Sequence, residues 1–172
     1  MTETKVLGIK EEHLNEDSSE RRAITFRLND ELIGIDIKSV IKITKSFDIT
    51  PVPKTPHYIL GVMNLRGNII PIVSLKEKLG IPEKEERDID ELMIVVIDTE
   101  VGYIGVTVDV IEGATVINNE EVLPPPMNSV GIDPEFIQGV VMIKKENPEL
   151  LIILDVSKIF NKEILNKEEG RC

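Results

Sequence analysis

The residues whose types and spacing most clearly suggest a binding function are the consecutive Asn64, Leu65, Arg66 and Gly67. They interrupt a longer, mainly apolar segment, residues 55–71, whose alternation is typical of a strand packed on a core. Gly67 can supply the positive φ of a tight turn, and Asn64 can hydrogen-bond the local backbone. Arg66 would then project near the turn, where its planar guanidinium can bind a carboxylate, an amide or a carbonyl. The spacing alone leaves two interpretations open, a binding site and a hairpin arginine that is only solvated.

Side chains that could perform catalysis are few. One histidine, His13, lies in a polar N-terminal segment, and the other, His57, occupies a position at which a repeated motif, described below, accepts any residue. The single cysteine, Cys172, is the last residue of the sequence. No histidine–cysteine cluster has the spacing of a metal site, and no glycine-rich loop precedes a helix as it does in phosphate-binding sites. We therefore predict neither an enzyme nor a cofactor or metal ion.

Composition narrows the possible partners. The chain has 172 residues, 41% of them hydrophobic, which suits one domain, or two small ones fused, with a real core. The net charge of −11 disfavours nucleic acid and anionic lipid, which attract proteins through Lys and Arg. The sequence has no run of 18 apolar residues and no signal-peptide core, and its one cysteine fits a reducing compartment. We expect a cytoplasmic protein that does not insert into a membrane.

Alternating apolar residues predict a mainly β fold. A hairpin is expected around Asn29 and Asp30, because apolar and polar residues alternate from Ala23 onward, over residues 24–28 and again over 33–37. The other strand candidates are residues 41–51, 61–65, 68–73, 92–98, 104–108, 140–143 and 150–154. Many short strands separated by turns are typical of small barrels or of a sandwich.

Helices are expected to be few and short. Ser74, followed by Glu77 three residues later, forms a capping box, and Gly80 ends the helix that follows. A charged loop is expected over residues 83–90. Asp155 can cap a helix near the C-terminus. The apolar stripe of that helix consists of Val156, Ile159, Phe160 and Ile164.

An internal repeat is the most informative feature of the sequence. Residues 55–62 and 133–140 share one order, namely a capping residue, proline, any residue, an aromatic residue, isoleucine, any residue, glycine and valine. A capping side chain before proline begins a helical turn. We predict that Gly61 and Gly139 end this turn in a left-handed conformation, and the alternative is that each admits a close backbone approach.

Two more landmarks recur in the same order. Upstream, residues 33–37 resemble 104–108, and each is followed closely by Val-Ile and a charged residue. Downstream, residues 72–75 resemble 153–156, a strand that leads into a helix cap. Three landmarks in two halves favour duplication over convergent turn chemistry. We therefore expect two similar small β-barrels in one compact unit.

The halves differ after the repeated glycines. The first half continues into the Asn-Leu-Arg-Gly block, whereas the second reads as a plain strand, residues 140–143, that runs into a charged hairpin. The scaffold alone therefore does not require the block.

The longest motif resembles that of a known family. Residues 52–75 contain the pattern P-x-x-P-x-x-I-x-G-x-x-N-L-R-G-x-x-x-P, which is similar to the signature of CheW, the adaptor family of bacterial chemotaxis. The resemblance extends over about residues 23–160 and includes the proline loop at 123–126. Many members of the family have aspartate at the position of Ser74, but both residues cap a helix.

The resemblance implies a fold that agrees with the repeat. It consists of two intertwined five-stranded barrels of the Src-homology-3-like type, with short helices and a C-terminal helix. The domains that we predict are a flexible acidic tail over residues 1–21, a CheW-like domain over 22–165 with repeat landmarks at 33–75 and 104–156, and a C-terminal tail over 166–172.

The resemblance also implies a non-enzymatic function. Members of the family couple the cytoplasmic tips of transmembrane chemoreceptors to the histidine kinase CheA, and they build arrays at the inner face of the membrane. CheA has a regulatory domain of the same double-barrel fold, against which one barrel would pack. Receptor tips are helical hairpins, so an apolar groove with a polar rim must accept a helix. The receptor-binding residues so implied are Val40, Ile41, Asn64, Leu65, Arg66 and Gly67.

A stiff apolar loop is a candidate for the kinase contact, and the alternative is a rigid connector between the barrels. The loop consists of Leu123, Pro124, Pro125 and Pro126. Two alternatives to the whole function stay open. One is a stand-alone double-barrel module that binds a ligand or protein outside chemotaxis. The other is a fragment of a CheV-like coupling protein, which the lack of residues for a receiver domain disfavours.

Overall fold

The computed structural model describes residues 19–45, 48–84, 88, 91–126, 131–143 and 145–161. The predicted C-terminal tail, most of the predicted N-terminal tail, Ile164 and most of the charged loop lie outside the described residues. In the part that the structure describes, no helix is both long enough and apolar enough to cross a membrane.

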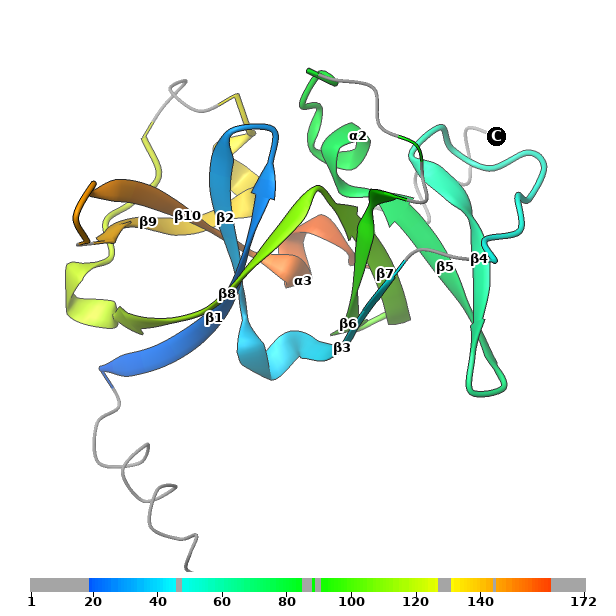
Figure 1. Ribbon diagram of the computed structural model, residues 1–172, viewed down its shortest axis with the longest axis horizontal. Helices are drawn as coiled ribbons and strands as arrows, with labels where there is room; N and C mark the ends of the chain where they lie inside the picture. The colour runs from blue at the N-terminus through cyan, green and yellow to red at the C-terminus, as the bar shows by residue number, and fades with distance from the viewer. Residues whose placement is uncertain are drawn as a thin grey trace, which may run out of the picture.

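Two five-stranded sheets lie side by side in the described chain (Figure 1). The first has the order β8-β1-β2-β10-β9, with β1 (Glu20–Leu28), β2 (Glu31–Asp36), β8 (Val110–Asn118), β9 (Ile137–Ile143) and β10 (Glu149–Leu154). The second has the order β3-β6-β7-β5-β4, with β3 (Val40–Lys45), β4 (Ile59–Leu65), β5 (Asn68–Ser74), β6 (Met93–Thr99) and β7 (Gly102–Val108). The helical elements are η1 (Ile37–Ser39), α2 (Leu75–Leu79), η3 (Asn119–Glu121), η4 (Pro134–Phe136) and α3 (Val156–Ile159). The predicted fold class is confirmed.

The two halves of the chain are interleaved. β1 and β2, from the first half, pair within the sheet of β8 to β10, whereas β6 and β7, from the second half, pair within the sheet of β3 to β5. In each sheet a parallel contact joins the halves, β2 with β10 and β5 with β7. The strands correspond in sheet order, β1 to β6, β2 to β7, β3 to β8, β4 to β9 and β5 to β10. This exchange of hairpins is the intertwined arrangement that the resemblance implied.

The repeated motif forms the same turn in both halves. The amide of Ile59 donates to the carbonyl oxygen of Pro56 at 3.0 Å, and the amide of Ile137 donates to that of Pro134. Both sheets also contain a register shift just after this isoleucine, so that each half carries a bulge at the same place. The equivalence of these bonds supports the repeat that the sequence indicated.

Among the described residues, one isolated bridge joins each barrel along its seam. Thr50 and Val62 exchange two backbone hydrogen bonds of 2.8 Å, and Leu123 and Val140 exchange bonds of 2.8 and 2.9 Å. Each bridge links the segment after one edge strand, β3 or β8, to the opposite edge strand, β4 or β9. No ladder continues from either bridge in the part of the chain that the structure describes, so the barrels are not closed by a continuous ladder there.

Gly61 and Gly139 allow these bridges to form, and their position corrects the sequence prediction. Neither residue ends the helical turn, because each lies two residues further along, inside β4 or β9. A Cβ atom on Gly61 would lie 2.3 Å from the carbonyl oxygen of Thr50, and one on Gly139 would lie 3.0 Å from that of Leu123. The prediction that these glycines end the turn in a left-handed conformation was wrong. The structure shows the alternative, a close approach of two backbone segments.

One core passes through both sheets. Phe26 of β1, Ile97 of β6 and Phe160 after α3 belong to it, and all three are fully buried. α3 lies between the two sheets (Figure 1), so its apolar side chains reach the sides of the sheets that face each other. Ser74 and Asp155 cap α2 and α3 as predicted, each by accepting a hydrogen bond from a helix amide.

A buried ion pair also joins the two sheets. Lys76 of α2 lies 3.0 Å (Nζ to Oδ2) from Asp109, which lies between β7 and β8, and both side chains are less than a tenth exposed. The same Oδ2 accepts a hydrogen bond of 2.8 Å from the amide of Asn29, in the β1–β2 turn. Lys76 Nζ also donates to Oδ1 of Asn29 at 3.2 Å and to Glu83 at 2.7 Å. A turn of the first sheet is therefore bonded to a helix of the second.

β8 is the strand that the sequence analysis missed. Exposed and half-buried residues alternate along most of it, and the side chains of Val110 and Val116 are among its exposed positions. Ile117 is its only buried residue, so the alternation carries little of the hydrophobic signal that marks a strand. Smaller differences are that β1 begins at Glu20, before Ala23, and that β3 ends at Lys45.

Candidate functional site

The Asn-Leu-Arg-Gly block forms the turn between β4 and β5. Leu65 pairs with Asn68, which leaves Arg66 and Gly67 as the two central residues of the hairpin, with φ of 53° and 86°. Two central residues with positive φ are the mark of a type I′ turn. Oδ1 of Asn64 accepts a hydrogen bond of 2.8 Å from the amide of Gly67. The side chain of Asn64 thus fixes the turn from which Arg66 projects.

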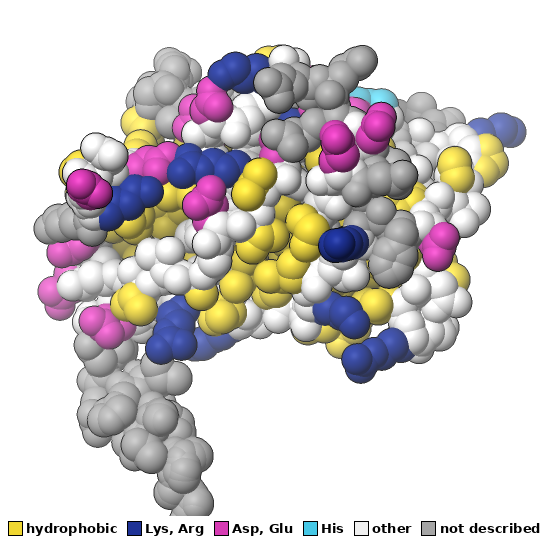
Figure 2. Space-filling view, in the orientation of Figure 1, with side chains coloured by type: hydrophobic (Ala, Val, Ile, Leu, Met, Phe, Trp, Pro, Cys, Tyr) yellow, Lys and Arg dark blue, Asp and Glu magenta, His cyan; other side chains and the backbone are white. Residues whose placement is uncertain are grey.

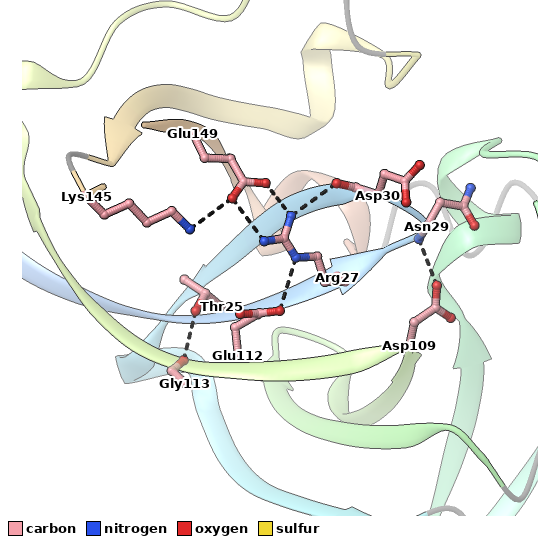
Figure 3. A network of polar contacts seen from close by, with 9 residues as sticks. All are labelled: Thr25, Arg27, Asn29, Asp30, Asp109, Glu112, Gly113, Lys145 and Glu149. Carbon is pink, nitrogen blue, oxygen red and sulfur yellow. Dashed lines mark hydrogen bonds and ion pairs between the residues drawn. The ribbon is translucent and has the colours of Figure 1, made fainter. Parts of the chain in front are cut away.

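Arg66 is exposed, and among the described residues its side chain has no hydrogen-bond or ion-pair partner. Arg27, in contrast, is fully engaged (Figure 3). Its Nε donates to Glu112 at 3.1 Å, its Nη2 donates to Glu149 at 3.0 Å, and its Nη1 donates to the carbonyl oxygen of Asp30. These hydrogen bonds raise the pKa of Arg27 and lower the pKa of Glu149 to about 2. The guanidinium of Arg66 is left available for an external carboxylate or carbonyl.

The apolar part of the predicted receptor site lies on and near β3. Ile41 is 45% exposed and sits at a register shift of the strand, whereas Val40 is half-buried and packs against the main core. Leu65 is also half-buried. In the order of the sheet, β6 and β7 separate β3 from the β4–β5 hairpin, and Figure 1 shows the tip of that hairpin extending away from the start of β3. The six residues predicted to bind the receptor therefore fall into two groups, an apolar one on β3 and one at the β4–β5 turn that contains the polar residues.

Ile69 is an exposed apolar residue that the sequence analysis did not select. It pairs with Asn64 across the β4–β5 hairpin and is 62% exposed. Its neighbours Ile70 and Ile72 are buried. The period of two along β5 was the signal that could have identified its outward orientation. Ile69 adds apolar surface beside the turn of Arg66.

The proline loop is partly exposed to solvent, and it also connects two strands of the first sheet. Leu123 is 62% exposed and Pro124 is exposed, whereas Pro125 and Pro126 are half-buried. At the same time, the backbone of Leu123 forms the bridge to β9. The equivalent segment of the first half, residues 50–53, also contains two prolines, which the sequence analysis did not relate to this loop. The loop thus connects strands of the first sheet and exposes the apolar side chains of Leu123 and Pro124.

The described residues contain no group of three or more His, Cys, Asp or Glu side chains that could hold a metal ion. The site consists of an exposed guanidinium, backbone turns and apolar side chains. Such a set can bind another protein surface.

Comparisons with known proteins agree with this geometry. The model of the CheW-like domain matches residues 22–163. A chemotaxis protein CheW from Treponema pallidum is 36% identical over 146 residues, which cover 84% of each chain. A chemotaxis protein CheW from Thermotoga maritima is 31% identical over 149 residues, which cover 87% of this chain and 93% of the relative.

A solved structure gives the same result. The scaffolding protein TtCheW from Thermoanaerobacter tengcongensis is 30% identical and matches with a TM-score of 0.72, over 82% of this chain and 88% of that one. The likeness in sequence and the likeness in fold thus cover the same double-barrel unit. The protein belongs to the CheW family.

Proposed function

We propose that the protein is a non-enzymatic coupling adaptor of bacterial chemotaxis, which joins chemoreceptor tips to the histidine kinase CheA and helps to build receptor–kinase arrays. The relatives support this role, since they are named chemotaxis proteins and the matched structure is named a scaffolding protein. On this proposal the protein acts in the cytoplasm, at the inner face of the membrane that carries the receptors.

The observation that carries the proposal is the conformation of Arg66. A left-handed conformation costs an L-residue about 1–2 kcal/mol, and Arg66 adopts it at φ 53° without any partner among the described residues that would offset the cost. Glycine or asparagine would be better suited to this position of a type I′ turn. An arginine kept there at a cost to stability is best explained by a contact with another molecule.

The proposed receptor contact combines both parts of the candidate site. Val40, Ile41 and Leu65 would supply apolar surface, and Arg66, aimed by Asn64 and Gly67, would supply charge-assisted hydrogen bonds at the rim. Burial of the apolar side chains would exclude water around the guanidinium, which strengthens those bonds.

The proposed kinase contact is the proline loop. An exposed leucine next to prolines loses little conformational entropy on binding, because the loop is already stiff and bridged to β9. Leu123 would therefore help to pack the first sheet against the regulatory domain of CheA, with Pro124, Pro125 and Pro126 holding it in place.

The receptor contact is tested by two titrations of Arg66→Ala, one with a receptor-tip fragment and one with the kinase regulatory domain. Charge-assisted bonds contribute about 1.5–3 kcal/mol, so receptor affinity should fall about tenfold or more, and Arg66→Lys should restore it only in part. Arg22→Ala, which removes another exposed arginine, from β1, is the matched control. Unchanged receptor affinity in folded Arg66→Ala would reduce Arg66 to a solvated hairpin residue.

The kinase contact is tested with Leu123→Asp. Affinity for the regulatory domain should fall while the melting temperature stays nearly unchanged, because the side chain of Leu123 is exposed and its bridge uses only backbone atoms. Val52→Asp, at an exposed apolar residue of the equivalent loop, is the control. Equal kinase affinity of both variants and the unmodified protein would leave the loop with a connecting role alone.

A further inference from the structure

The charge of the chain is unevenly distributed. Residues 37–75 contain five Lys or Arg residues and one Asp, a net charge of +4, although the whole chain has a net charge of −11. All other residues together therefore carry a net charge of −15. This one segment contains η1, β3, the β4–β5 hairpin and their connections.

Three of these cations follow the edge of the second sheet. Lys38 lies on η1, and Lys42 and Lys45 lie on β3, the last strand in the order of the sheet. We call these three residues the basic edge. Figure 2 shows Lys and Arg side chains over and around the place that β3 occupies in Figure 1, beside a hydrophobic area at the centre of this face.

The lysines of the basic edge are without partners among the described residues. None of its three side chains forms a hydrogen bond or ion pair with another described residue. Four cations elsewhere in the described chain, Arg27, Lys76, Lys84 and Lys145, have carboxylate partners, whereas single exposed cations such as Arg22 and Lys158 form no ion pair with a described residue. In a strongly acidic chain, cations that stay unpaired together are available for carboxylates from outside.

Exposed apolar side chains alternate with these lysines. Ile37 directly precedes Lys38 and is 37% exposed, and Ile41 directly precedes Lys42 and is 45% exposed. Apolar and cationic residues therefore lie next to each other along η1 and β3, and Figure 2 shows Lys and Arg side chains beside a hydrophobic area on this face. Its chemical complement is an apolar stripe bordered by carboxylates.

The equivalent strand of the other sheet shows that the fold does not require this arrangement. Lysines on edge strands can serve only to prevent association with other strands. β8, which corresponds to β3, contains no Lys or Arg, and its one charged residue, Glu112, is paired with Arg27. An edge strand at this position is therefore stable without cations, so protection of the edge does not account for the basic edge.

We propose that the basic edge binds an amphipathic helix that carries Glu or Asp on both sides of an apolar stripe. A helix is favoured over an added strand, because the register shift at Ile41 interrupts the ladder and lysines oppose strand addition. The inference rests on the proposed function and deepens it, since it states which side chains a receptor helix presents to β3. An anionic membrane is disfavoured by the net charge of −15 on the rest of the chain.

The test uses the full chain, labelled with nitrogen-15, and two helical peptides with the same leucine stripe, one flanked by Glu and the other by Lys. At low ionic strength the acidic peptide should shift the amide signals of η1 and β3, and the basic peptide should not. Lys38→Glu combined with Lys45→Glu should weaken binding about tenfold or more and remove most of its salt dependence. Both lysines are exposed, so the variant should fold.

Lys158→Glu is the matched control, because Lys158 is an exposed lysine on α3 and belongs to neither η1 nor β3. The proposal is overturned if the acidic peptide shifts no β3 amide, if the double variant binds as tightly as Lys158→Glu, or if anionic vesicles shift the same amides as strongly. A parallel titration with a receptor-tip fragment separates the two proposals. If only the acidic peptide binds, the proposed function fails and the basic edge stands.

Discussion

The equivalent edge strands β3 and β8 differ in the charge of their side chains. β3 carries Lys42 and Lys45, which have no partners among the described residues, and its second residue is the exposed Ile41. β8 carries a single charged residue, Glu112, which pairs with Arg27 within the same sheet. Both strands nevertheless occupy the end of a five-stranded sheet with the same order. The shared features are therefore those that make the fold, and the features found on one side only are candidates for function.

The hairpins at the opposite edges differ in the same way. The β4–β5 hairpin closes in two residues, with Arg66 at a positive φ and no partner among the described residues. After β9, the charged side chain of Lys145 bonds to Glu149 of β10 at 3.1 Å. In one hairpin Lys145 is paired within the hairpin, and in the other Arg66 is presented to solvent. Both differences are consistent with the proposal that charged partners bind to the second sheet.

The largest expected difference between the halves concerns the buried Lys76–Asp109 pair. Lys76→Met leaves a buried carboxylate without its cation, which should lower the free energy of unfolding by about 3–5 kcal/mol. The equivalent residue on α3 is Ser157, which is exposed, and Ser157→Ala should change stability by less than about 0.5 kcal/mol. Urea unfolding measures both values. If Lys76→Met combined with Asp109→Leu proves no more stable than Lys76→Met, the loss does not come from the unpaired charge.

The next largest difference concerns the two glycines. A Cβ on Gly61 meets the backbone carbonyl of Thr50 at 2.3 Å, whereas one on Gly139 first meets a side chain, Cγ1 of Val122, at 2.4 Å. A side chain can move more easily than a bridged backbone, so Gly61→Ala should cost about 3 kcal/mol and Gly139→Ala about 1–2 kcal/mol. Valine should be worse than alanine at both positions. Thermal melts that rank Gly139→Ala as the more damaging change would contradict this account of the seam.

The sequence predicted the features that one or two neighbouring residues decide. The caps Ser74 and Asp155 and the turn around Gly67 follow from local hydrogen bonds and allowed φ values, and they formed as expected. The repeated glycines were recognised as important but assigned the wrong role. Glycine is required at these positions because a segment more than ten residues away, at Thr50 or Leu123, packs closely against the backbone. No local sequence pattern reveals that contact.

Features that depend on distant residues could not be predicted from the sequence. The Lys76–Asp109 pair forms only because the exchange of hairpins brings α2 next to the β7–β8 connection. β8 was missed because all of its residues except Ile117 are exposed or half-buried, so the hydrophobic alternation that marks a strand was weak. In the candidate site, Arg66 was identifiable from its motif, whereas the basic edge needed the sheet order, which identifies β3 as an edge strand.

A smaller effect is expected from the Arg27–Glu149 ion pair of the first sheet. Arg66, in the second sheet, has no such partner among the described residues. The pKa of Glu149 is lowered from 4.5 to about 2, chiefly because Arg27 donates hydrogen bonds to it. The carboxylate therefore stabilises the fold above about pH 4.5, and its contribution is lost as the pH falls toward 2. Glu149→Gln should cost about 1 kcal/mol near neutral pH and close to nothing in acid. Glu31→Gln, at an exposed residue of β2, is the control, and a cost for Glu149→Gln that is equal at both pH values would contradict the assignment.

The smallest expected effect has the opposite sign and tests the central comparison directly. In the β1–β2 turn the left-handed position is held by Asn29, at φ 58°, whereas the β4–β5 turn has Arg66 at φ 53°. Arg66→Asn creates the Asn-Gly pair that type I′ turns prefer, so it should raise the free energy of unfolding by about 0.5–1 kcal/mol. The same variant should lose receptor binding, because the guanidinium is gone. A gain in stability together with a loss of binding would show that arginine is kept at this position for its contact and not for the fold. A variant that is destabilised, with its receptor affinity intact, would place the value of Arg66 within the folded protein, and the comparison between the two hairpins would then carry no functional meaning.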